Sequence, residues 1–545
     1  MTVGGPATAL PAQPKPALLT PVPFTTAPTP LTPVPFTTAP APLTSTPVAP
    51  GHSTPVPVGF APPKESTAAV VGDAKAADRF LHDFVRREAK FYEIARDPDT
   101  KLTFDGIQVD GAGQPNARRH WSAASKESLD IGIAIKALEG NSLAAEYTAG
   151  GDIKLARAKA ANLLNVKMDS YLKFNKANPG YGGMLPWFYS GKTITPTPDW
   201  QGKVPGLDNG EWLWSMMTAE HSLRRNGFVE VADRYRSYLD ITSTSVVPMF
   251  YDAGAGKVRG DVDVVDPKSL HSAYRTMGDD SPTSKYMTYL SGDHGIHEGA
   301  MMVHYVTMFG KGLPKEAPDR IWSDIKMQRV EHKAGSTWQA YWGSAHESWA
   351  YLFMPFRDDT RYADLFRIRE QIRSQNAVAR GYAGFATSTN DPRTGGYLDG
   401  AGIEGISKMA IRNNDTYAAY GAFPALLQHV GTGTAATADG RVALGWLANM
   451  LHGPKMYGPL GGGESATNDG TATALMKTID GSFPLLLSMM GGLEQETADM
   501  LRSTGTYDAF RKRIAGEYDE AFGAAPLRET GGFVAPTVAP LNSAP

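Results

Sequence analysis

The sequence predicts an all-α protein, an (α/α)6 toroid, that follows a disordered N-terminal tail. About a dozen stretches carry apolar residues at helical spacing. The connections between them are rich in Gly, Pro, Asn and Asp and alternate between long and short. Six helical hairpins closed into a ring fit this pattern, although helix bundles and solenoids share it. A closed ring would also gather loops from distant parts of the sequence at one rim.

The tail is predicted from a repeat. TPVPFTTAP occurs at 20–28 and again at 32–40. This density of proline prevents helix and sheet formation, and the segment buries too little to offset the entropy of ordering it. We therefore expect a disordered Pro/Thr-rich tail over 1–70, a catalytic domain over 71–525 and a disordered C-terminal tail over 526–545.

The first predicted helix covers 74–97, where Phe80, Phe84 and Phe91 fall at helical spacing before Asp97-Pro98 ends it. Short hairpins are expected within 250–270 and 380–400. The remaining predicted helices lie near 121–138, 153–176, 210–226, 229–247, 296–309, 317–331, 344–355, 359–377, 414–430, 439–451, 471–490 and 493–522.

Charge and composition exclude several classes of function. The chain has 53 basic and 56 acidic residues, a net charge of -3, which is too balanced for a nucleic-acid partner. It has no cysteine, so disulfides, zinc–thiolate sites and cysteine nucleophiles are excluded. No apolar run approaches the length of a membrane-spanning helix, and the N-terminus lacks the pattern of a secretory signal. We expect no cofactor.

Four segments place polar residues where a helical hairpin should turn or pack. In PGLDNGEWLW, Asp208 and Glu211 are three residues apart and so share one face of a helix, beside Trp212. Sugar rings present apolar C–H faces that suit aromatic planes, but Trp212 could equally pack in the core. The two carboxylates could equally cap the helix.

The second segment, LSGDHGIHEGAMM, contains Asp293, His294, His297 and Glu298. It lacks the H-E-x-x-H spacing of a familiar zinc site, so we expect no metal. Apolar neighbours would raise the pKa of Glu298, as a general acid needs. The alternative is a solvated carboxylate in the first turn of a helix.

In the third segment, WQAYWGSAHESWAYLFMP, Glu347 stands between Trp342 and Trp349, where a carboxylate could bind sugar hydroxyls. A helix N-terminus would also favour Glu347 there. In the fourth, a Gly-rich loop leads to Asp480, which precedes the apolar run FPLLLSMM. Asp480 could be a functional carboxylate or the cap of that helix. The loop lacks the Lys and Ser/Thr of a phosphate-binding loop.

The four segments together resemble the endo-β-1,2-glucanases of bacteria and fungi and the related glycoamylase-like domains of cyclic β-1,2-glucan synthases. The resemblance covers about 180–495, on motifs in the same order: GYGGMLPWF before PGLDNGEWLW, then HEGAMMVHYVTMFGKGLP, GSAHESWAYLFMP and IDGSFPLLLSMM. It implies a glycoside hydrolase on an (α/α)6 toroid.

The resemblance also implies roles for individual residues. Glu298 resembles the general acid and Asp480 the general base of an inverting hydrolase. Asp208, Glu211 and Glu347 resemble sugar-binding or supporting carboxylates. We expect the remaining substrate contacts from the neighbouring aromatic and histidine side chains, which are Trp212, Trp342, Trp349 and His297.

The chain departs from the family pattern at three places. Gly299 and Ala300 follow Glu298, where the family has an Arg, and Gly481 replaces a Gln. Thr387 stands near where the family's S-E-S motif has its Glu, on which transglycosylating relatives rely. The sequence therefore favours hydrolysis over transglycosylation.

Two other functions fit parts of the pattern. A polysaccharide lyase on an α/α toroid would need a basic cleft and would release an unsaturated product. A non-catalytic, secreted carbohydrate-binding effector would bind oligosaccharides without turnover. We favour the hydrolase, with an oligo- or polysaccharide substrate, a monomeric state and an extracytoplasmic location despite the missing signal.

Overall fold

A computed structural model describes residues 59–277, 288–290, 299–431 and 436–540. The chain divides into two units, Met1–Pro55 and Val56–Pro545, and the described residues all belong to the second. The helices of this unit are α1 Thr67–Gly72, α2 Ala74–Ile94, α3 Ala124–Leu138, α4 Ser142–Ala149, α5 Ile153–Ala177, α6 Gly206–Arg225, α7 Val229–Phe250, α8 Gly299–Phe309, α9 Ala317–Asp324, α10 Ala350–Phe353, α11 Thr360–Arg380, α12 Phe423–His429, α13 Ala438–Leu451, α14 Ile479–Met489, α15 Glu494–Ser503 and α16 Tyr507–Phe522.

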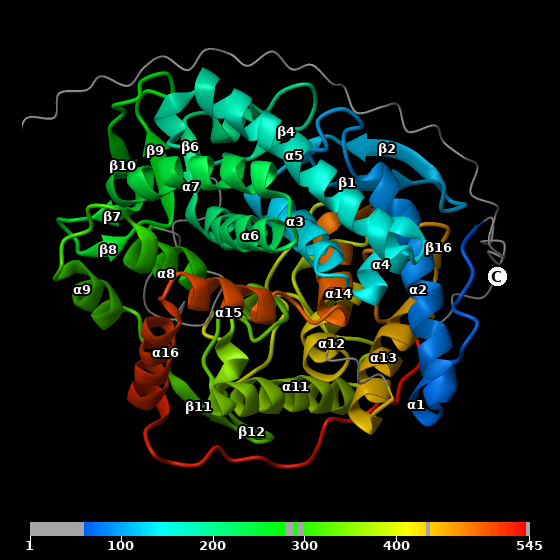
Figure 1. Cartoon of the computed structure of the whole chain (residues 1–545). Coiled ribbons are helices and arrows are strands. Elements are labelled where there is room, and N and C mark those ends of the chain that lie inside the picture. The colour runs from blue at the N-terminus through cyan, green and yellow to red at the C-terminus, as the bar shows by residue number, and fades with distance from the viewer. Residues whose placement is uncertain (1–58, 278–287, 291–298, 432–435, 541–545) are drawn as a thin grey trace, which may run out of the picture. The chain divides into compact units, whose positions relative to one another are not determined.

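These helices form the predicted toroid of inner and outer helices. Figure 1 shows α2, α5, α7, α11 and α13 around α3, α6, α12 and α14. Consecutive helices pack as pairs, α6 on α7 and α12 on α13, while α3 joins the inner helices α6 and α14. The expectation of an all-α (α/α)6 toroid is confirmed.

The inner helix α3 is buried along its whole length. Its sequence, ASKESLDIGIAIKAL, supplies apolar residues on every side but also four charged side chains: Lys126, Glu127, Asp130 and Lys136. Buried charges are tolerated when they are paired and hydrogen-bonded. Each of the four has an oppositely charged partner on another segment, so α3 ties several parts of the toroid together.

Short antiparallel strands connect the helices. The strands are β1 Gly106–Val109, β2 Pro115–Arg119, β3 Trp121–Ser122, β4 Phe188–Tyr189, β5 Thr195–Pro196, β6 Lys203–Pro205, β7 Tyr251–Asp252, β8 Lys257–Val258, β9 Asp261–Val264, β10 Tyr274–Thr276, β11 Arg329–His332, β12 Gly335–Trp338, β13 Thr389–Asn390, β14 Tyr397–Leu398, β15 Thr416–Ala418, β16 Tyr457–Gly458, β17 Gly461–Gly462, β18 Ser465–Thr467 and β19 Met476–Thr478. The two predicted hairpin regions are confirmed by β7–β8 and β13–β14. The sheet β19–β1–β2 brings the start of α14 beside the segment that precedes β1.

Several predicted helices were too long. Residues 329–332 form β11, which pairs with β12, so the helix predicted over 317–331 ends at Asp324. Residues 414–430 and 471–490 each begin with a strand, and α12 and α14 start later. Gly505 has a φ of 71°, which divides 493–522 into α15 and α16. Interstrand pairing and glycine turns override helical periodicity at these places.

The predicted tails also reach too far into the chain. Ser66 accepts a hydrogen bond from Ala69 N and caps α1, which lies within the tail expected over 1–70. The segment 526–540 was expected to be disordered, yet Trp446 Nε1 donates to Val534 O at 2.7 Å and Asn449 Nδ2 to Val538 O at 2.9 Å. Side-chain donors on α13 thus hold this extended segment, a contact that composition does not reveal. Within the described ranges, no helix has the length and apolarity needed to cross a membrane.

Candidate active site

One cleft of about 200 Å³ gathers residues from segments that are distant in the sequence. It is lined by Asp105, Arg119, Trp121, Trp187, His346, Trp349, Ser388, Thr389, Asn390, Tyr397, Tyr420, Glu464, Thr478, Asp480 and Gly481. Aromatic walls around a few convergent polar groups are typical of a small-molecule site. The fold therefore brings loops from distant parts of the sequence together around one cleft.

A larger hollow of about 740 Å³ lies between α11, α16 and residues 523–529. Its carboxylates are engaged: Asp519 pairs with Arg361 at 2.5 Å and Glu529 with Arg367 at 2.6 Å. The hydrogen bond from Arg367 lowers the pKa of Glu529. We therefore place the chemistry in the smaller cleft, where carboxylates are less completely neutralised.

Asp480 lies in the first turn of α14, with its side chain 41% exposed. Thr478 caps this helix, and its Oγ1 accepts a hydrogen bond from Gly481 N at 3.0 Å. The positive end of the helix dipole favours a carboxylate here. Asp480 Oδ2 accepts a hydrogen bond from Lys126 Nζ at 2.5 Å. Its Oδ1 is buried and accepts no hydrogen bond from any residue that the structure describes.

Lys126 links Asp480 to a second carboxylate, Asp105. Lys126 Nζ lies 3.5 Å from Asp105 Oδ1, and Arg119 Nε lies 2.8 Å from Asp105 Oδ2. Burial is the largest influence on Asp105 and raises its pKa to about 6, against the two cations, while the charges of Asp480 and Glu464 add to the rise. Burial opposes the charge of Lys126, but Asp480 and Asp105 outweigh it and raise the pKa of Lys126.

Glu464 supports the start of α14 from the other side. Its Oε2 accepts hydrogen bonds from Thr478 N at 3.2 Å and Thr478 Oγ1 at 2.7 Å, and its Oε1 accepts one from Asn390 Nδ2 at 2.7 Å. In a capping box, a Glu or Gln three residues into the helix takes the amide of the capping residue. Here Gly481 occupies that position, and a Cβ on it would lie 2.5 Å from Glu464 Oε2. The departure at Gly481 thus has a physical reason, because Glu464 occupies the space and supplies the carboxylate.

Tryptophan rings form one wall of the cleft. Trp121 stacks on Trp187 with ring centres 5.1 Å apart, and Trp187 stacks on Trp200 at 5.3 Å. Trp187 Nε1 donates to Asp208 Oδ2 at 2.5 Å, which fixes the middle ring. Flat aromatic surfaces with satisfied N–H groups suit the apolar C–H faces of sugars.

Trp349 lies in the same cleft as Asp480. Trp349 Nε1 donates to Tyr420 Oη at 2.6 Å, and both side chains line the cleft. Asp208 joins the site through Trp187. These are the expected site residues that the structure brings together.

Other expected site residues lie elsewhere. Glu347, expected as a sugar-binding or supporting carboxylate, is fully buried, and its Oε1 accepts hydrogen bonds from Trp342 N at 2.9 Å and Gly343 N at 3.2 Å. These two bonds tie Glu347 to the loop that precedes it. Glu211 and Trp212 are buried within α6 and do not line the cleft, and neither does the half-buried Trp342.

Two expected residues, His297 and Glu298, lie outside the described residues, as do Asp293 and His294. Their expected roles stay predictions from the sequence. Among the residues that are described, no three His, Asp or Glu side chains are grouped as a metal ion would require.

Sequence reasoning missed Asp105, Lys126, Arg119 and Glu464. One signal was available for Lys126, because a lysine inside the apolar run AASKESLDIGIAI must be paired if the helix is buried. Glu464 lies in the Gly-rich loop before Asp480, where no local pattern marks it as a partner of the helix that follows. Asp105 and Arg119 carry no local pattern, since only the pairing of β1 with β2 and β19 brings them to the cleft.

Comparison with known proteins identifies the family of the chain. Residues 102–539 match the family described as endo-beta-1,2-glucanase SGL. An endo-beta-1,2-glucanase from Talaromyces funiculosus, solved with sophorose, is 27% identical, has a TM-score of 0.79, and is matched over 88% of this chain and 98% of that chain. A mutant of that enzyme solved with beta-1,2-glucan matches equally well.

A more distant match shows the fold alone. An endo-beta-1,2-glucanase from Chitinophaga pinensis, solved with sophorotriose and glucose, is 13% identical, with a TM-score of 0.57 over 80% of this chain and 98% of that chain. A search of curated proteins found no match. Because the family match spans most of the chain, this protein belongs to the endo-β-1,2-glucanase family and is a glycoside hydrolase of β-1,2-glucan.

Proposed function

We propose that the chain cleaves β-1,2-glucan with inversion, with Asp480 as the general base and Glu298 as the general acid. One observation carries the proposal for Asp480. Its carboxylate lies in the aromatic cleft with one oxygen held by Lys126 and the other without a hydrogen-bond donor among the described side chains. A base needs this combination of fixed orientation and a free lone pair. The role of Glu298 rests on the sequence.

In an inverting hydrolase the base removes a proton from the water that attacks the anomeric carbon, while the acid protonates the departing oxygen on the opposite face. The two carboxyl groups usually stand about 6.5–9.5 Å apart so that the water fits between them. Each of the two roles is worth about 10²–10⁴ in rate. Asp480 is suited to the first role because it lies in the first turn of α14, where Lys126 holds one of its oxygens in a fixed direction.

The charge of the cleft favours hydrolysis over the lyase alternative. A lyase acting on an acidic glycan would want unneutralised cations, but Lys126 and Arg119 are both paired with carboxylates. The stacked Trp121 and Trp187 offer a surface for neutral sugar rings. We therefore expect no unsaturated product absorbing in the ultraviolet.

The first experiment is a product assay by mass spectrometry on linear and cyclic β-glucans, joined to NMR of the first-formed anomer. The proposal predicts oligosaccharides from β-1,2-glucan and reducing ends that appear first as the α-anomer. First-formed β-anomer would mean retention and would remove Asp480 from the role of base. No release from β-1,2-glucan would mean that the fold carries another specificity.

A matched pair of variants tests the two acids separately. Glu298→Gln and Asp480→Asn should each remove most turnover and keep oligosaccharide binding by calorimetry. A variant with near-normal turnover would lose its assigned role, whatever the result for the other.

We also propose a location outside the cytoplasm and a monomeric state. A polymeric glucan substrate favours secretion or a periplasmic location, and we expect a monomer. Cell fractionation and light scattering of the purified protein test these two points.

A further inference from the structure

The ammonium group of Lys126 is held at three sides inside the cleft. Its Nζ lies 2.5 Å from Asp480 Oδ2, 3.5 Å from Asp105 Oδ1 and 4.7 Å from the centre of the Trp121 ring. The side chain is only 4% exposed. We propose that Lys126 is a positioning residue that fixes Oδ2 of Asp480 and leaves the buried Oδ1, which has no donor among the described residues, to take the proton of the attacking water; this inference rests on the proposed function of Asp480.

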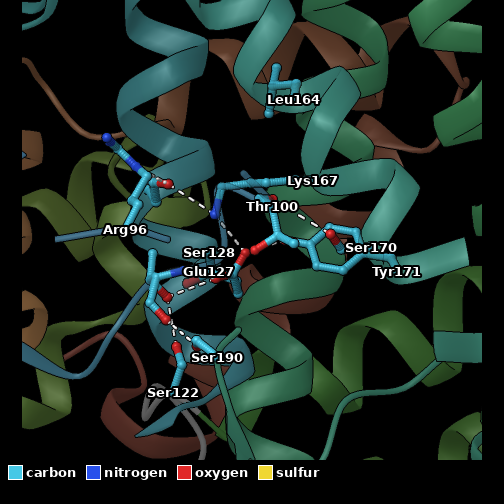
Figure 2. Close-up of polar contacts among 12 residues, drawn as sticks. Arg96, Thr100, Ser122, Glu127, Ser128, Leu164, Lys167, Ser170, Tyr171 and Ser190 are labelled. Atoms are coloured by element: carbon cyan, nitrogen blue, oxygen red, sulfur yellow. Dashed lines mark hydrogen bonds and ion pairs between the residues drawn. The ribbon is translucent and has the colours of Figure 1, made fainter. Parts of the chain in front are cut away.

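The backbone that carries Lys126 is anchored through the residues that follow it on α3. The next residue, Glu127, accepts hydrogen bonds from Lys167 Nζ at 2.6 Å, Thr103 N at 2.7 Å and Tyr171 Oη. Figure 2 shows Lys167 and Tyr171 pointing at Glu127 from α5. One helix turn further, Asp130 pairs with Lys167 at 2.9 Å. These buried bonds fix the rotation of α3 and with it the direction of Lys126.

The backbone that carries Asp480 is tied to the same framework. Ile479 N, at the start of α14, donates a hydrogen bond to Asp105 O at 2.9 Å. The backbone next to Asp480 is therefore bonded to Asp105, whose side chain also contacts Lys126. Thr478 and Gly106 are register partners in the β19–β1 pair. Lysine and carboxylate are thus held by two rigid elements rather than by their own flexible side chains, which suits a positioning role.

Lys126 neither donates nor accepts a proton in the proposed step. As the bond between the water oxygen and the anomeric carbon forms, the water proton passes to Asp480 Oδ1 and the leaving oxygen takes a proton from the acid. At the end of the step Asp480 is protonated and the acid is ionised. Proton exchange with solvent then restores the starting protonation state of each. Lys126 stays charged throughout, because its two carboxylate neighbours raise its pKa.

The position of Lys126 also makes a prediction about pH. The charged and titratable groups facing Asp480 in the described part of the chain are Lys126, Asp105, Arg119, His346 and Glu464. Asp208 on α6 also acts on Lys126. Of these, only Lys126 donates to Asp480 directly. Loss of this cation should therefore change the pH dependence of activity, which a merely structural residue would leave in place.

The experiment measures kcat and KM of the full chain against pH for Lys126→Met and Asp105→Asn. Lys126→Met should move the acid limb upward and lower the plateau of kcat at least about tenfold, with KM within about twofold. Asp105→Asn should move the acid limb downward, because it removes a negative charge near Asp480 and leaves Asp480 as the remaining carboxylate partner of Lys126. The two limbs belong to a coupled group, so their direction is the readout.

Two further variants separate positioning from folding. Lys126→Arg keeps the charge in a different geometry, so the limb should stay in place while kcat falls. Lys136→Met is the matched control: it is the same substitution on the same helix and breaks a buried pair with Glu496 at 2.6 Å, but Lys136 does not line the cleft. It should leave the limb unmoved.

The outcomes distinguish this inference from the proposed function. If Asp480→Asn keeps its turnover, the proposed function fails and Lys126 has no base to position. If Asp480→Asn is inactive but neither Lys126→Met nor Asp105→Asn moves the limb, Lys126 is not a positioning residue. A rise in KM with unchanged kcat in Lys126→Met would also overturn the inference, because Lys126 would then bind sugar. If Lys126→Met does not fold, Asp105→Asn and Lys126→Arg decide.

Discussion

Helix α3 contributes residues to two neighbouring charge clusters. The core cluster consists of Glu127 and Asp130 with Lys167 and Arg96. The cleft cluster consists of Asp105 and Asp480 with Lys126 and Arg119. Each has two carboxylates and two cations, and adjacent residues of α3, Lys126 and Glu127, belong to different clusters.

The two clusters differ in how completely their carboxylates are hydrogen-bonded. In the core cluster, both oxygens of Asp130 accept from Arg96, at 2.6 and 2.8 Å, and Glu127 has partners on both oxygens. In the cleft cluster, Asp480 Oδ1 has no donor among the described residues. Burial opposes the ionisation of Asp130, but its cations outweigh burial and lower its pKa, whereas burial raises that of Asp105 to about 6.

The core cluster and the cleft cluster have the same number of charges and differ in how many of their carboxylate oxygens accept hydrogen bonds. We infer that this difference separates a structural role from a reactive one. A fully bonded buried pair is costly to break but has nothing left to offer a substrate. A cluster with one open oxygen is weaker as an anchor but can accept a proton. Damage to the core cluster should therefore reduce stability, and damage to the cleft cluster should reduce turnover.

The largest effect is expected for Asp480→Asn. The variant should lose about 10²–10⁴ in kcat, because the amide cannot accept the water proton. Its melting temperature should stay close to that of the unmodified protein, since the side chain is 41% exposed. Kinetics on β-1,2-glucan together with calorimetric unfolding measure both. A large loss of stability with normal kcat would contradict this assignment, because it would show that the cleft cluster serves stability and not turnover.

Lys167→Met should have the next largest effect. It leaves Glu127 and Asp130 buried without one of their cations, which costs about 3–5 kcal/mol of unfolding free energy. Below its unfolding transition the variant should keep most of its kcat. Urea unfolding at pH 7 measures the loss. A stable variant would show that the core cluster does not anchor α3.

The same variant makes a prediction about acid stability. Because the folded-state pKa of Asp130 is lowered, its ionisation contributes stability that is present above its unfolded pKa of about 3.9. This stability is lost as the pH falls through the folded pKa. The difference between Lys167→Met and the unmodified protein should therefore shrink in acid, and a difference that is constant down to pH 2 would contradict this.

Gly481→Ala should cost less, about 1–3 kcal/mol, because the added Cβ would lie 2.5 Å from Glu464 Oε2. Adding Glu464→Ala removes the clash, so the double variant should lose less stability than the sum of the two single variants. Thermal unfolding of all three gives the coupling. Additive losses would mean that Glu464 does not explain the glycine.

The smallest effect is expected for Tyr171→Phe. It removes one hydrogen bond to Glu127 and leaves those from Lys167 and Thr103, so it should cost about 1 kcal/mol with unchanged kcat. Chemical unfolding checks the first point and turnover the second. A loss of kcat in this folded variant would show that the core cluster acts on the cleft directly.

Sequence reasoning identified one member of the cleft cluster, Asp480, and no member of the core cluster. Asp480 was identifiable because it opens an apolar helix after a Gly-rich loop. Its partner Lys126 lies 354 positions away, and no local pattern joins them. Asp105 and Glu464 likewise reach the cleft only through strand pairing and helix capping. The toroid was predictable because helical periodicity is local, while β11 and β19 were missed because interstrand pairing determines them.

Chemical rescue tests the central claim, that Asp480 is the base, most directly. Asp480→Ala, inactive with water, should regain turnover of β-1,2-glucan when azide is added, because azide attacks without losing a proton. The product should be the α-glycosyl azide, with inverted configuration. Full activity of Asp480→Ala without azide, or formation of the β-glycosyl azide, would contradict the account.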